Sequence, residues 1–268
     1  MDDRNVKTIS YHGGRWKKQP TEIISEQAVT LSVNNAPWLT FMCTPVCLEE
    51  LGIGFLYNEE IIQSMQEVAS VRVCPSGDII DIWLNQAVQK PDRWMRTSGC
   101  SGGETSVDGI KVQSIPAILK NEVSLKAETI GSLITQLINA QELYKQSGGI
   151  HTSALSDGET ILVIAEDIGR HNTLDKLAGK CLMGQLPSAK PILLTTGRVS
   201  SEMMQKSGRI GARVVISRTS PTSLSVKMAE QMGITLIGYA RLARFTIYTH
   251  PERVDTIPMS ARMMSEAR

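Results

Sequence analysis

The sequence of 268 residues has few aromatic side chains, few cysteines and almost no net charge. It holds four Trp, five Tyr, three Phe and five Cys, and 28 Lys plus Arg stand against 27 Asp plus Glu. Proteins dedicated to nucleic acids usually carry a clear basic excess, so near-neutrality argues against a nucleic-acid partner. Five cysteines are an odd number and do not form a disulfide framework. With 41% hydrophobic residues, the chain can still bury a substantial core.

Long hydrophobic runs are also lacking. The longest uninterrupted apolar stretch covers only residues 161–165, whereas a membrane helix needs about 20 apolar residues. The first residues are polar and contain no apolar signal-peptide region. We therefore expect a cytoplasmic protein with reduced thiols and no membrane partner.

The distribution of aromatic residues divides the chain into two units. All four Trp lie before residue 95, and no aromatic residue occurs between positions 95 and 143. We expect an N-terminal α+β domain over residues 1–112 that ends in the loop carrying Cys100. An α/β domain over 113–250 and a C-terminal tail over 251–268 are expected to follow.

The first unit has the pattern of short strands around one helix. Asn34 and Asn35 mark a turn between two strand-like segments, and Thr44 followed by Pro45 is typical of a helix start. The stretch from 47 to 62 has helical periodicity. The expected strands cover residues 28–33, 38–43, 68–74 and 79–84.

The second unit alternates strands and helices. A helical stripe over 128–145 ends before two glycines, and a turn at Asp157-Gly158 joins two strands at 150–155 and 160–165. Three strand and helix pairs complete the unit. The strands are expected at 192–195, 213–217 and 234–239, and the helices at 173–183, 200–206 and 222–232. This order predicts a mostly parallel sheet between layers of helices.

Arginines follow the strands of this predicted sheet. Parallel strands bind ligands at their carboxyl ends, and helix N-termini there favour anions. Because arginine binds phosphate oxygens in a bidentate manner, the pattern predicts a phosphate-bearing ligand such as a nucleotide. In the alternative interpretation these arginines pair with Glu166, Asp167 and Asp175. The arginines are Arg170, Arg198, Arg218, Arg241 and Arg244.

His171 lies in the segment that follows the expected strand 160–165. Its imidazole could be a ligand-binding base, a proton shuttle or a neighbour of a helix N-cap. With only His151 nearby and no cysteine partner, the pattern argues against a metal site.

The five cysteines differ in their surroundings. Cys43, Cys47, Cys74 and Cys181 stand beside apolar segments and are expected to be inert core residues. Cys100 instead lies between glycines and hydroxyl residues in RTSGCSGG at 96–103, a composition that predicts an exposed loop. Loop N–H groups and a nearby arginine stabilise a thiolate, and a carried persulfide needs the same setting. The alternative is a linker with an incidental cysteine.

The chain resembles the FdhD family of formate dehydrogenase accessory sulfurtransferases. The most specific match is EDIGRHN at 166–172. The resemblance is carried by GGIHTSAL at 148–155, EDIGRHNTLDKLAG at 166–179, TTGRVSSEM at 195–203, SRTSPTSLSVKMAEQMGITLIGYAR at 217–241 and FTIYTH at 245–250.

The resemblance implies a cytidine-deaminase-like α/β/α domain with a smaller N-terminal domain, and a homodimer. It implies that Cys100 accepts sulfur from a cysteine desulfurase as a persulfide. The sulfur would pass to the bis-molybdopterin guanine dinucleotide molybdenum cofactor before its insertion into formate dehydrogenase, and GDP or GTP would mimic that cofactor. The matching cofactor-binding residues are Tyr239, Ala240, Arg241, Leu242, Ala243 and Arg244, to which we add Arg170 and His171.

One departure from the family pattern keeps a second hypothesis open. Many members carry Cys-x-x-Cys in the loop, whereas this chain has Gly103 at the second position. The first hypothesis is a sulfur carrier that needs only Cys100. The second is a non-catalytic chaperone that binds the cofactor or a guanine nucleotide without thiol chemistry. Deamination is disfavoured because the sequence lacks both His-x-Glu and Pro-Cys-x-x-Cys.

Overall fold

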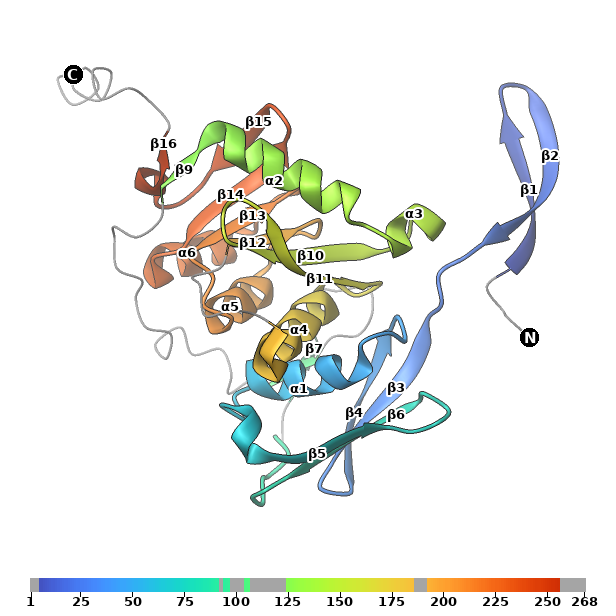
Figure 1. Cartoon of the computed structure of the whole chain (residues 1–268), viewed down its shortest axis with the longest axis vertical. Coiled ribbons are helices and arrows are strands. Elements are labelled where there is room, and N and C mark those ends of the chain that lie inside the picture. The colour runs from blue at the N-terminus through green and yellow to red at the C-terminus, as the bar shows by residue number, and fades with distance from the viewer. Residues whose placement is uncertain (1–4, 92–93, 97–103, 107–123, 186–191, 256–268) are drawn as a thin grey trace.

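The structure is a computed structural model that describes residues 5–91, 94–96, 104–106, 124–185 and 192–255 (Figure 1). Two sheets of unequal size lie on either side of a pair of contacting helices, and a separate hairpin extends from the body. The mixed α/β class is therefore confirmed. The finer cytidine-deaminase-like description stays a prediction, and the expected boundary at 112/113 lies outside the described residues.

The N-terminal sheet has four strands in the order β4-β3-β6-β5. Asn34 and Asn35, with φ of 49° and 65°, make the turn between β3 and β4, since Asn tolerates the left-handed region. Alternate residues of the sheet pack on helix α1 to form one core. The elements are β3 (Gln27–Val33), β4 (Ala36–Cys43), α1 (Leu48–Asn58), β5 (Val68–Val73) and β6 (Ile79–Leu84).

The larger sheet has six strands in the order β11-β10-β12-β13-β14-β15. The pairs β12–β13 and β13–β14 are parallel, and the other neighbouring strands of this sheet are antiparallel. The strands are β10 (His151–Ser156), β11 (Ile161–Asp167), β12 (Ile192–Thr195), β13 (Val214–Ser217), β14 (Thr235–Arg241) and β15 (Arg244–Ile247).

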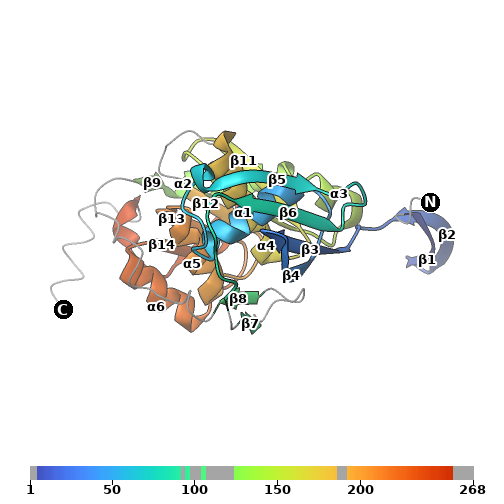
Figure 2. The same cartoon turned by 90° about the horizontal axis from the view of Figure 1, so that it is seen from below.

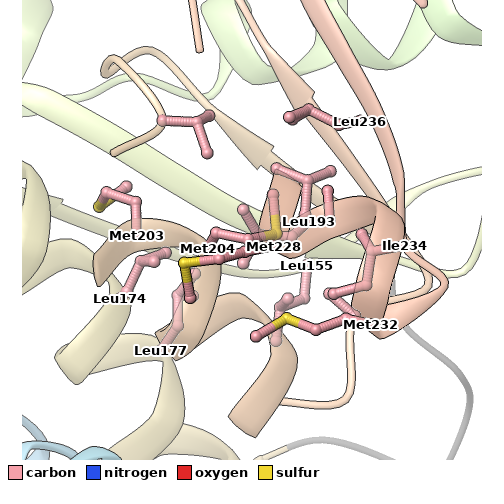
Figure 3. Close-up of a cluster of buried hydrophobic side chains, with 14 of the residues drawn as sticks. Leu155, Leu174, Leu177, Leu193, Met203, Met204, Met228, Met232, Ile234 and Leu236 are labelled. Carbon is pink, nitrogen blue, oxygen red and sulfur yellow. The ribbon is translucent and has the colours of Figure 1, made fainter. Parts of the chain in front are cut away.

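Helices cover both faces of this sheet. Along β12, Leu193 faces one core while its neighbours Ile192 and Leu194 face the other, because successive side chains of a strand alternate. The first core contains leucines and methionines from the sheet, α4, α5 and α6 (Figure 3). The second lies under α2. The helices are α2 (Ala127–Asn139), α3 (Leu143–Ser147), α4 (Arg170–Lys180), α5 (Ser201–Arg209) and α6 (Ser223–Met232).

Helices α1 and α4 join the two sheets through backbone contact. A Cβ added at Gly54 would lie 1.7 Å from the Asp175 carbonyl oxygen, and one at Gly179 would lie 2.0 Å from that of Glu50. Each helix therefore contributes a glycine at the point where the other approaches. No larger residue fits at either position without separating the helices.

A buried ion pair reinforces this junction. The Lys176 Nζ lies 2.6 Å from Asp167 Oδ2, and both side chains are fully buried. Lys176 also donates to the Thr44 carbonyl at 3.0 Å, and the Thr44 N–H donates to Asp167 Oδ2 at 3.2 Å. Helix α4 is thus polar in sequence yet buried almost throughout, because its charged groups find partners in both halves of the molecule.

Shorter elements complete the fold. Strands β1 (Asn5–His12) and β2 (Arg15–Glu22) form the separate hairpin, and β9 (Leu125–Lys126) pairs with β16 (Val254–Asp255). The described part of the expected tail, 251–255, therefore joins the edge of the second unit. No helix among the described residues is long and apolar enough to cross a membrane. The remaining elements are η1 (Met65–Glu67), β7 (Trp94–Arg96), β8 (Glu104–Ser106), η4 (Cys181–Gln185) and η5 (Pro251–Arg253).

Three local predictions are wrong. The large sheet is mixed and not mostly parallel, since β10 runs against both of its neighbours. Helix α1 has Cys47 and not Thr44 as its N-cap, because the Thr44 hydroxyl accepts the Ile168 N–H instead. The helix expected over 128–145 is divided into α2 and α3, because the Glu166 carboxylate accepts the first N–H groups of a new helix.

Candidate functional site

The carboxyl ends of four strands meet at one edge of the large sheet. β10 is antiparallel to both β11 and β12, so those two strands run in the same direction, which β13 and β14 share. The segments after these strands were expected to carry a ligand site, and the structure brings them together. They are 168–172, 196–200, 218–222 and 239–244, and β10 begins at the same edge.

A pocket of about 340 Å³ opens at this edge. Its walls come from four parts of the chain, which are the segment 141–151 around α3 and the start of β10, and the residues that follow β11, β12 and β13. Most of the lining residues are polar, aromatic or glycine, and two are isoleucines. The lining residues are Gln141, Tyr144, Gly148, Gly149, Ile150, His151, Ile168, Thr196 and Arg218.

Arg218 is the cation of the pocket. Its backbone N–H donates to the Thr195 carbonyl at 3.0 Å, and its carbonyl accepts a hydrogen bond from the Arg241 guanidinium. Its Nε is buried and has no hydrogen-bond partner in the described part of the chain. Partial burial lowers the pKa of Arg241, and the nearby cations Arg218 and Arg244 lower it further. Three of the five expected arginines therefore lie close together, where an anion would relieve their repulsion.

The other two arginines lie near His151. Burial lowers the pKa of His151, and the charges of Arg170, His171 and Arg198 lower it further. The imidazole is therefore neutral at pH 7 and can donate or accept a hydrogen bond at the pocket wall. A Cβ added at Gly197 would lie 2.9 Å from the Arg170 Cβ, so glycine allows the Arg170 side chain to pass there.

In the alternative interpretation the arginines pair with Glu166, Asp167 and Asp175, but these carboxylates are bound by other groups. Asp175 lies 2.6 Å from Lys206 Nζ, and Asp167 forms the ion pair with Lys176. Glu166 accepts the backbone N–H groups of residues 142–144. None of these contacts involves Arg218, Arg241 or Arg244.

His171 lies in the first turn of α4 but does not line the pocket. Its Nε2 is 3.0 Å from Glu202 Oε2 and 3.3 Å from the hydroxyl of Ser200, the N-cap of α5. Burial lowers the pKa of His171, and Glu202 opposes that shift. Of the three predicted roles, the geometry favours the neighbour of a helix N-cap. Arg170 and His171 remain predicted ligand contacts, and neither is among the residues that line the pocket.

Residues 239–244 form the end of β14 and the turn to β15. Tyr239 adopts a left-handed φ of 52° and is 51% exposed, and the sheet register is interrupted between Gly238 and Arg241. Ala240 is buried in the core, whereas Leu242 is 72% exposed. The turn therefore presents an aromatic ring, an apolar side chain and two arginines beside Arg218.

Cys100 lies outside the described residues, and the other four cysteines differ from one another. Burial raises the pKa of the Cys43 thiol to about 12 and that of Cys181 to about 11. Cys74 is half-buried in a hairpin turn and not in the core as expected, and its Sγ donates to Asp78 Oδ1 at 2.9 Å. Cys47 is half-buried at the start of α1.

Sequence reasoning missed most of the pocket wall. Tyr144 and Gln141 belong to a segment expected to be plain helix, and Gly148 and Gly149 were assigned only to its end. The available signal was the GGIHTSAL segment at 148–155, which contributes to the resemblance described above but which the strand-end argument does not include. No cluster of three or more His, Cys, Asp or Glu suited to a metal occurs in the described ranges.

Known proteins resemble the chain over nearly its whole length. The model of the FdhD/NarQ family matches residues 24–255. The sulfur carrier protein FdhD of Staphylococcus aureus strain MRSA252 is 34% identical over 92% of this chain and 94% of its own length. The protein of the same name from Staphylococcus haemolyticus is 33% identical over the same shares.

A solved structure agrees with these sequence matches. A protein from Desulfotalea psychrophila, described as a formate dehydrogenase accessory protein, shares 27% identity and superposes with a TM-score of 0.78. The match covers 93% of this chain and 98% of the other. Family model, relatives and fold therefore agree, and the chain belongs to the FdhD/NarQ family.

Proposed function

We propose that the chain is a sulfurtransferase that carries sulfur on Cys100. It accepts sulfur from a cysteine desulfurase and passes it to the bis-molybdopterin guanine dinucleotide molybdenum cofactor before that cofactor enters formate dehydrogenase. The observation that carries the proposal is the match, over 92% of the chain, to proteins named sulfur carriers. The structural relative is described as a formate dehydrogenase accessory protein, which supports formate dehydrogenase as the client enzyme.

The chemistry of loading needs one reactive thiolate. The Cys100 thiolate attacks the outer sulfur of the donor's persulfide, and the donor's inner sulfur leaves as a thiolate. One sulfur–sulfur bond breaks and one forms, so no further oxidant takes part. Cys43 and Cys181 are poor candidates because burial keeps their thiols protonated at pH 7. The glycine-rich surroundings of Cys100 suit an accessible nucleophile better.

The strand-end pocket is the proposed place for the cofactor's nucleotide end. Arg218, Arg241 and Arg244 supply the charge that pyrophosphate oxygens require. Tyr144 in the pocket wall offers a ring on which a planar base can stack. Neutral His151 adds a hydrogen-bonding group that does not increase the charge.

Loading is tested by incubating the protein with a cysteine desulfurase and cysteine, followed by peptide mass spectrometry. One added sulfur atom is expected on the Cys100 peptide, and Cys100→Ala abolishes it. Cys74→Ala is the matched control, because that thiol is half-buried and engaged by Asp78, and it leaves loading unchanged. Label only on other cysteines would refute the assignment.

Cofactor binding is tested by calorimetry with GDP. Arg218→Gln and Arg241→Gln should each weaken binding about tenfold, because each removes one charge-assisted contact to phosphate. Arg72→Gln is the control, since Arg72 is exposed on the N-terminal sheet far from the strand ends in sequence. Unchanged affinity in both pocket variants would remove the site.

The chaperone hypothesis remains the second candidate. Gly103 in place of a second loop cysteine favours it, and the pocket groups need no thiol to bind a nucleotide. The two candidates differ in one outcome. A cell that produces Cys100→Ala protein should lose formate dehydrogenase activity if the chain carries sulfur, and should keep it if the chain only binds the cofactor.

A further inference from the structure

One carboxylate holds the part of the pocket wall that carries Gln141 and Tyr144. Helix α3 follows α2 after a bend and lies on the side of the body from which the β1–β2 hairpin extends (Figures 1 and 2). It has five residues, and the side chain of its N-cap, Glu142, makes no capping hydrogen bond. A helix this short is not stable by itself. Its support comes from Glu166 near the end of β11, which accepts the N–H groups of residues 142, 143 and 144 at 3.0, 2.9 and 3.3 Å.

The same carboxylate determines where the hydroxyl proton of Thr152 points. The Thr152 Oγ1 lies 3.4 Å from Glu166 Oε1 and 2.8 Å from Nε2 of the Gln141 side chain. Thr152 is fully buried and is not among the residues that line the pocket. A carboxylate can only accept, and it binds a hydroxyl proton more strongly than an amide oxygen does. The Thr152 hydroxyl therefore donates to Glu166 and accepts from Gln141.

This direction of donation fixes the side-chain amide of Gln141. An amide has a donor end and an acceptor end of similar size, so its hydrogen bonds decide which end faces a ligand. Because Nε2 donates to Thr152, the free end is Oε1, and no residue in the described part of the chain donates to it. Gln141 is 2% exposed yet lines the pocket. The wall thus presents a fixed acceptor that has little contact with water.

A donor lies beside this acceptor. The Thr152 N–H donates to Thr196 Oγ1 at 3.0 Å, and the Thr196 N–H donates to the Thr152 carbonyl at 2.9 Å. The Thr196 side chain lines the pocket, and within the described ranges no group accepts its hydroxyl proton. Gln141 and Thr196 are therefore both bonded to Thr152 and present one acceptor and one donor. The edge of a nucleotide base carries the complementary pattern of neighbouring donors and acceptors.

A fixed acceptor selects between chemical groups. It binds an N–H of a ligand and disfavours a carbonyl oxygen at the same position, because two facing acceptors leave both without a proton. If the Gln141 amide were free to rotate, its nitrogen would face the carbonyl instead and the selection would be lost. The selection therefore depends on Thr152 and Glu166, which do not themselves need to touch the ligand.

We propose that Gln141 accepts a hydrogen bond from an amino or imino N–H of the ligand's base. Glu166 and Thr152 are positioning residues that hold Gln141 in the accepting orientation, and the Thr196 hydroxyl donates to the neighbouring acceptor of the base. The inference rests on the proposed function, because it requires that a nucleotide base enters the strand-end pocket. It adds the chemical group that is recognised and the residue that recognises it.

The test compares two nucleotides by calorimetry with the full-length chain. The probes are GDP and xanthosine diphosphate, in which a carbonyl oxygen replaces the amino group of the guanine. The wild type should bind GDP about 30-fold more tightly, because the xanthine oxygen faces Gln141 Oε1. The ratio of the two affinities is compared between variants, so a difference in charge between the two bases cancels.

Thr152→Val removes the hydroxyl at almost constant size. Gln141 is then free to rotate, so the preference for GDP should fall below about threefold, mainly because xanthosine diphosphate binds more tightly. Thr152→Ser keeps the hydroxyl and should restore the preference. Thr135→Val is the matched control, because the Thr135 hydroxyl bonds the Gly131 carbonyl within α2. A merely structural role of Thr152 would weaken both nucleotides equally and leave the ratio unchanged.

Two further variants separate this inference from the proposed function. Gln141→Leu should abolish the preference, and Glu166→Gln should reduce it, because an amide at position 166 can donate to Thr152 and turn its proton toward Gln141. Equal wild-type affinities for the two nucleotides, or a preference that persists in both Thr152→Val and Gln141→Leu, overturn the inference and leave the nucleotide site in place. A wild type that binds neither nucleotide overturns the proposed site itself.

Discussion

Two regions of the molecule hold charged residues: the junction between α1 and α4, and the strand-end edge of the large sheet. They differ in whether these charges have partners within the protein. At the junction buried charges are paired, as in the 2.6 Å contacts of Lys176 with Asp167 and of Lys206 with Asp175. At the edge Arg218, Arg241 and Arg244 lie near one another, and the Arg218 Nε has no partner within the described chain. Both sites draw on the same segment, 166–172. Paired charges there hold the fold together, and unpaired charges nearby are available for a ligand.

The largest effect on stability is expected from Lys176→Met. The substitution leaves the Asp167 carboxylate buried without its cation, so the free energy of unfolding should fall by about 3–5 kcal/mol. Urea denaturation measures it. Lys227→Met is the matched control, because Lys227 is exposed on α6. The double variant with Asp167→Asn should recover part of the loss, and a loss below about 1 kcal/mol in Lys176→Met would show that the pair is not essential.

The second effect tests the backbone contact. Gly179→Ala places a Cβ 2.0 Å from the Glu50 carbonyl oxygen, and separation of the helices should cost about 1–3 kcal/mol. In Gly149→Ala the new Cβ meets only the Ile24 Cγ2 at 3.7 Å, an ordinary contact. Equal thermal unfolding temperatures for the two variants would contradict the close approach.

A smaller effect should follow from pH. The pKa values of His151 and His171 lie below the ordinary value in the folded protein, mainly through burial. As the pH falls through about 6.5, the unfolded chain binds protons first, so stability decreases by at most about 1.4 kcal/mol per pH unit for each histidine. Denaturation of the wild type and of His151→Asn at several pH values measures the difference. Parallel curves would refute the shift for His151.

The smallest effect on stability is expected at the edge. Arg218→Gln removes one of three neighbouring cations, so the free energy of unfolding should change by no more than about 0.5 kcal/mol while GDP affinity falls. Chemical denaturation of the variant used for calorimetry measures both properties on one sample. A large loss of stability would mean that Arg218 supports the fold, and the contrast between the two regions would disappear.

Much of the fold follows from the sequence because it depends on local signals. The continuous apolar runs at 192–194 and 214–216 predict buried strands, and β12 and β13 confirm them. The errors in the predicted elements arise where a residue that would stabilise its own segment instead forms hydrogen bonds with residues far away in the sequence. Thr44 is a good helix cap by sequence, but Asp167 and Ile168, more than 120 positions away, bind its backbone and side chain.

The candidate site was partly predictable for the same reason. The arginines after each strand could be assigned to one edge from the order of elements, and two of them, Arg241 and Arg244, lie near Arg218. The wall formed by Tyr144 and Gln141 could not, because it depends on the bend that Glu166 creates between α2 and α3. The β1–β2 hairpin was not predicted, although Gly13 and Gly14 between the two strands, both with positive φ, form a typical two-residue hairpin turn.

Helix α4 has a consequence for the folding of the whole chain. It completes the core of the large sheet with Leu174 and Leu177, and its opposite side completes the N-terminal half through Gly179 and Lys176. Neither half can satisfy its buried groups when the other unfolds. Two sheets with separate hydrophobic cores should therefore melt in a single cooperative transition, and a fragment that ends before Arg170 should not fold by itself.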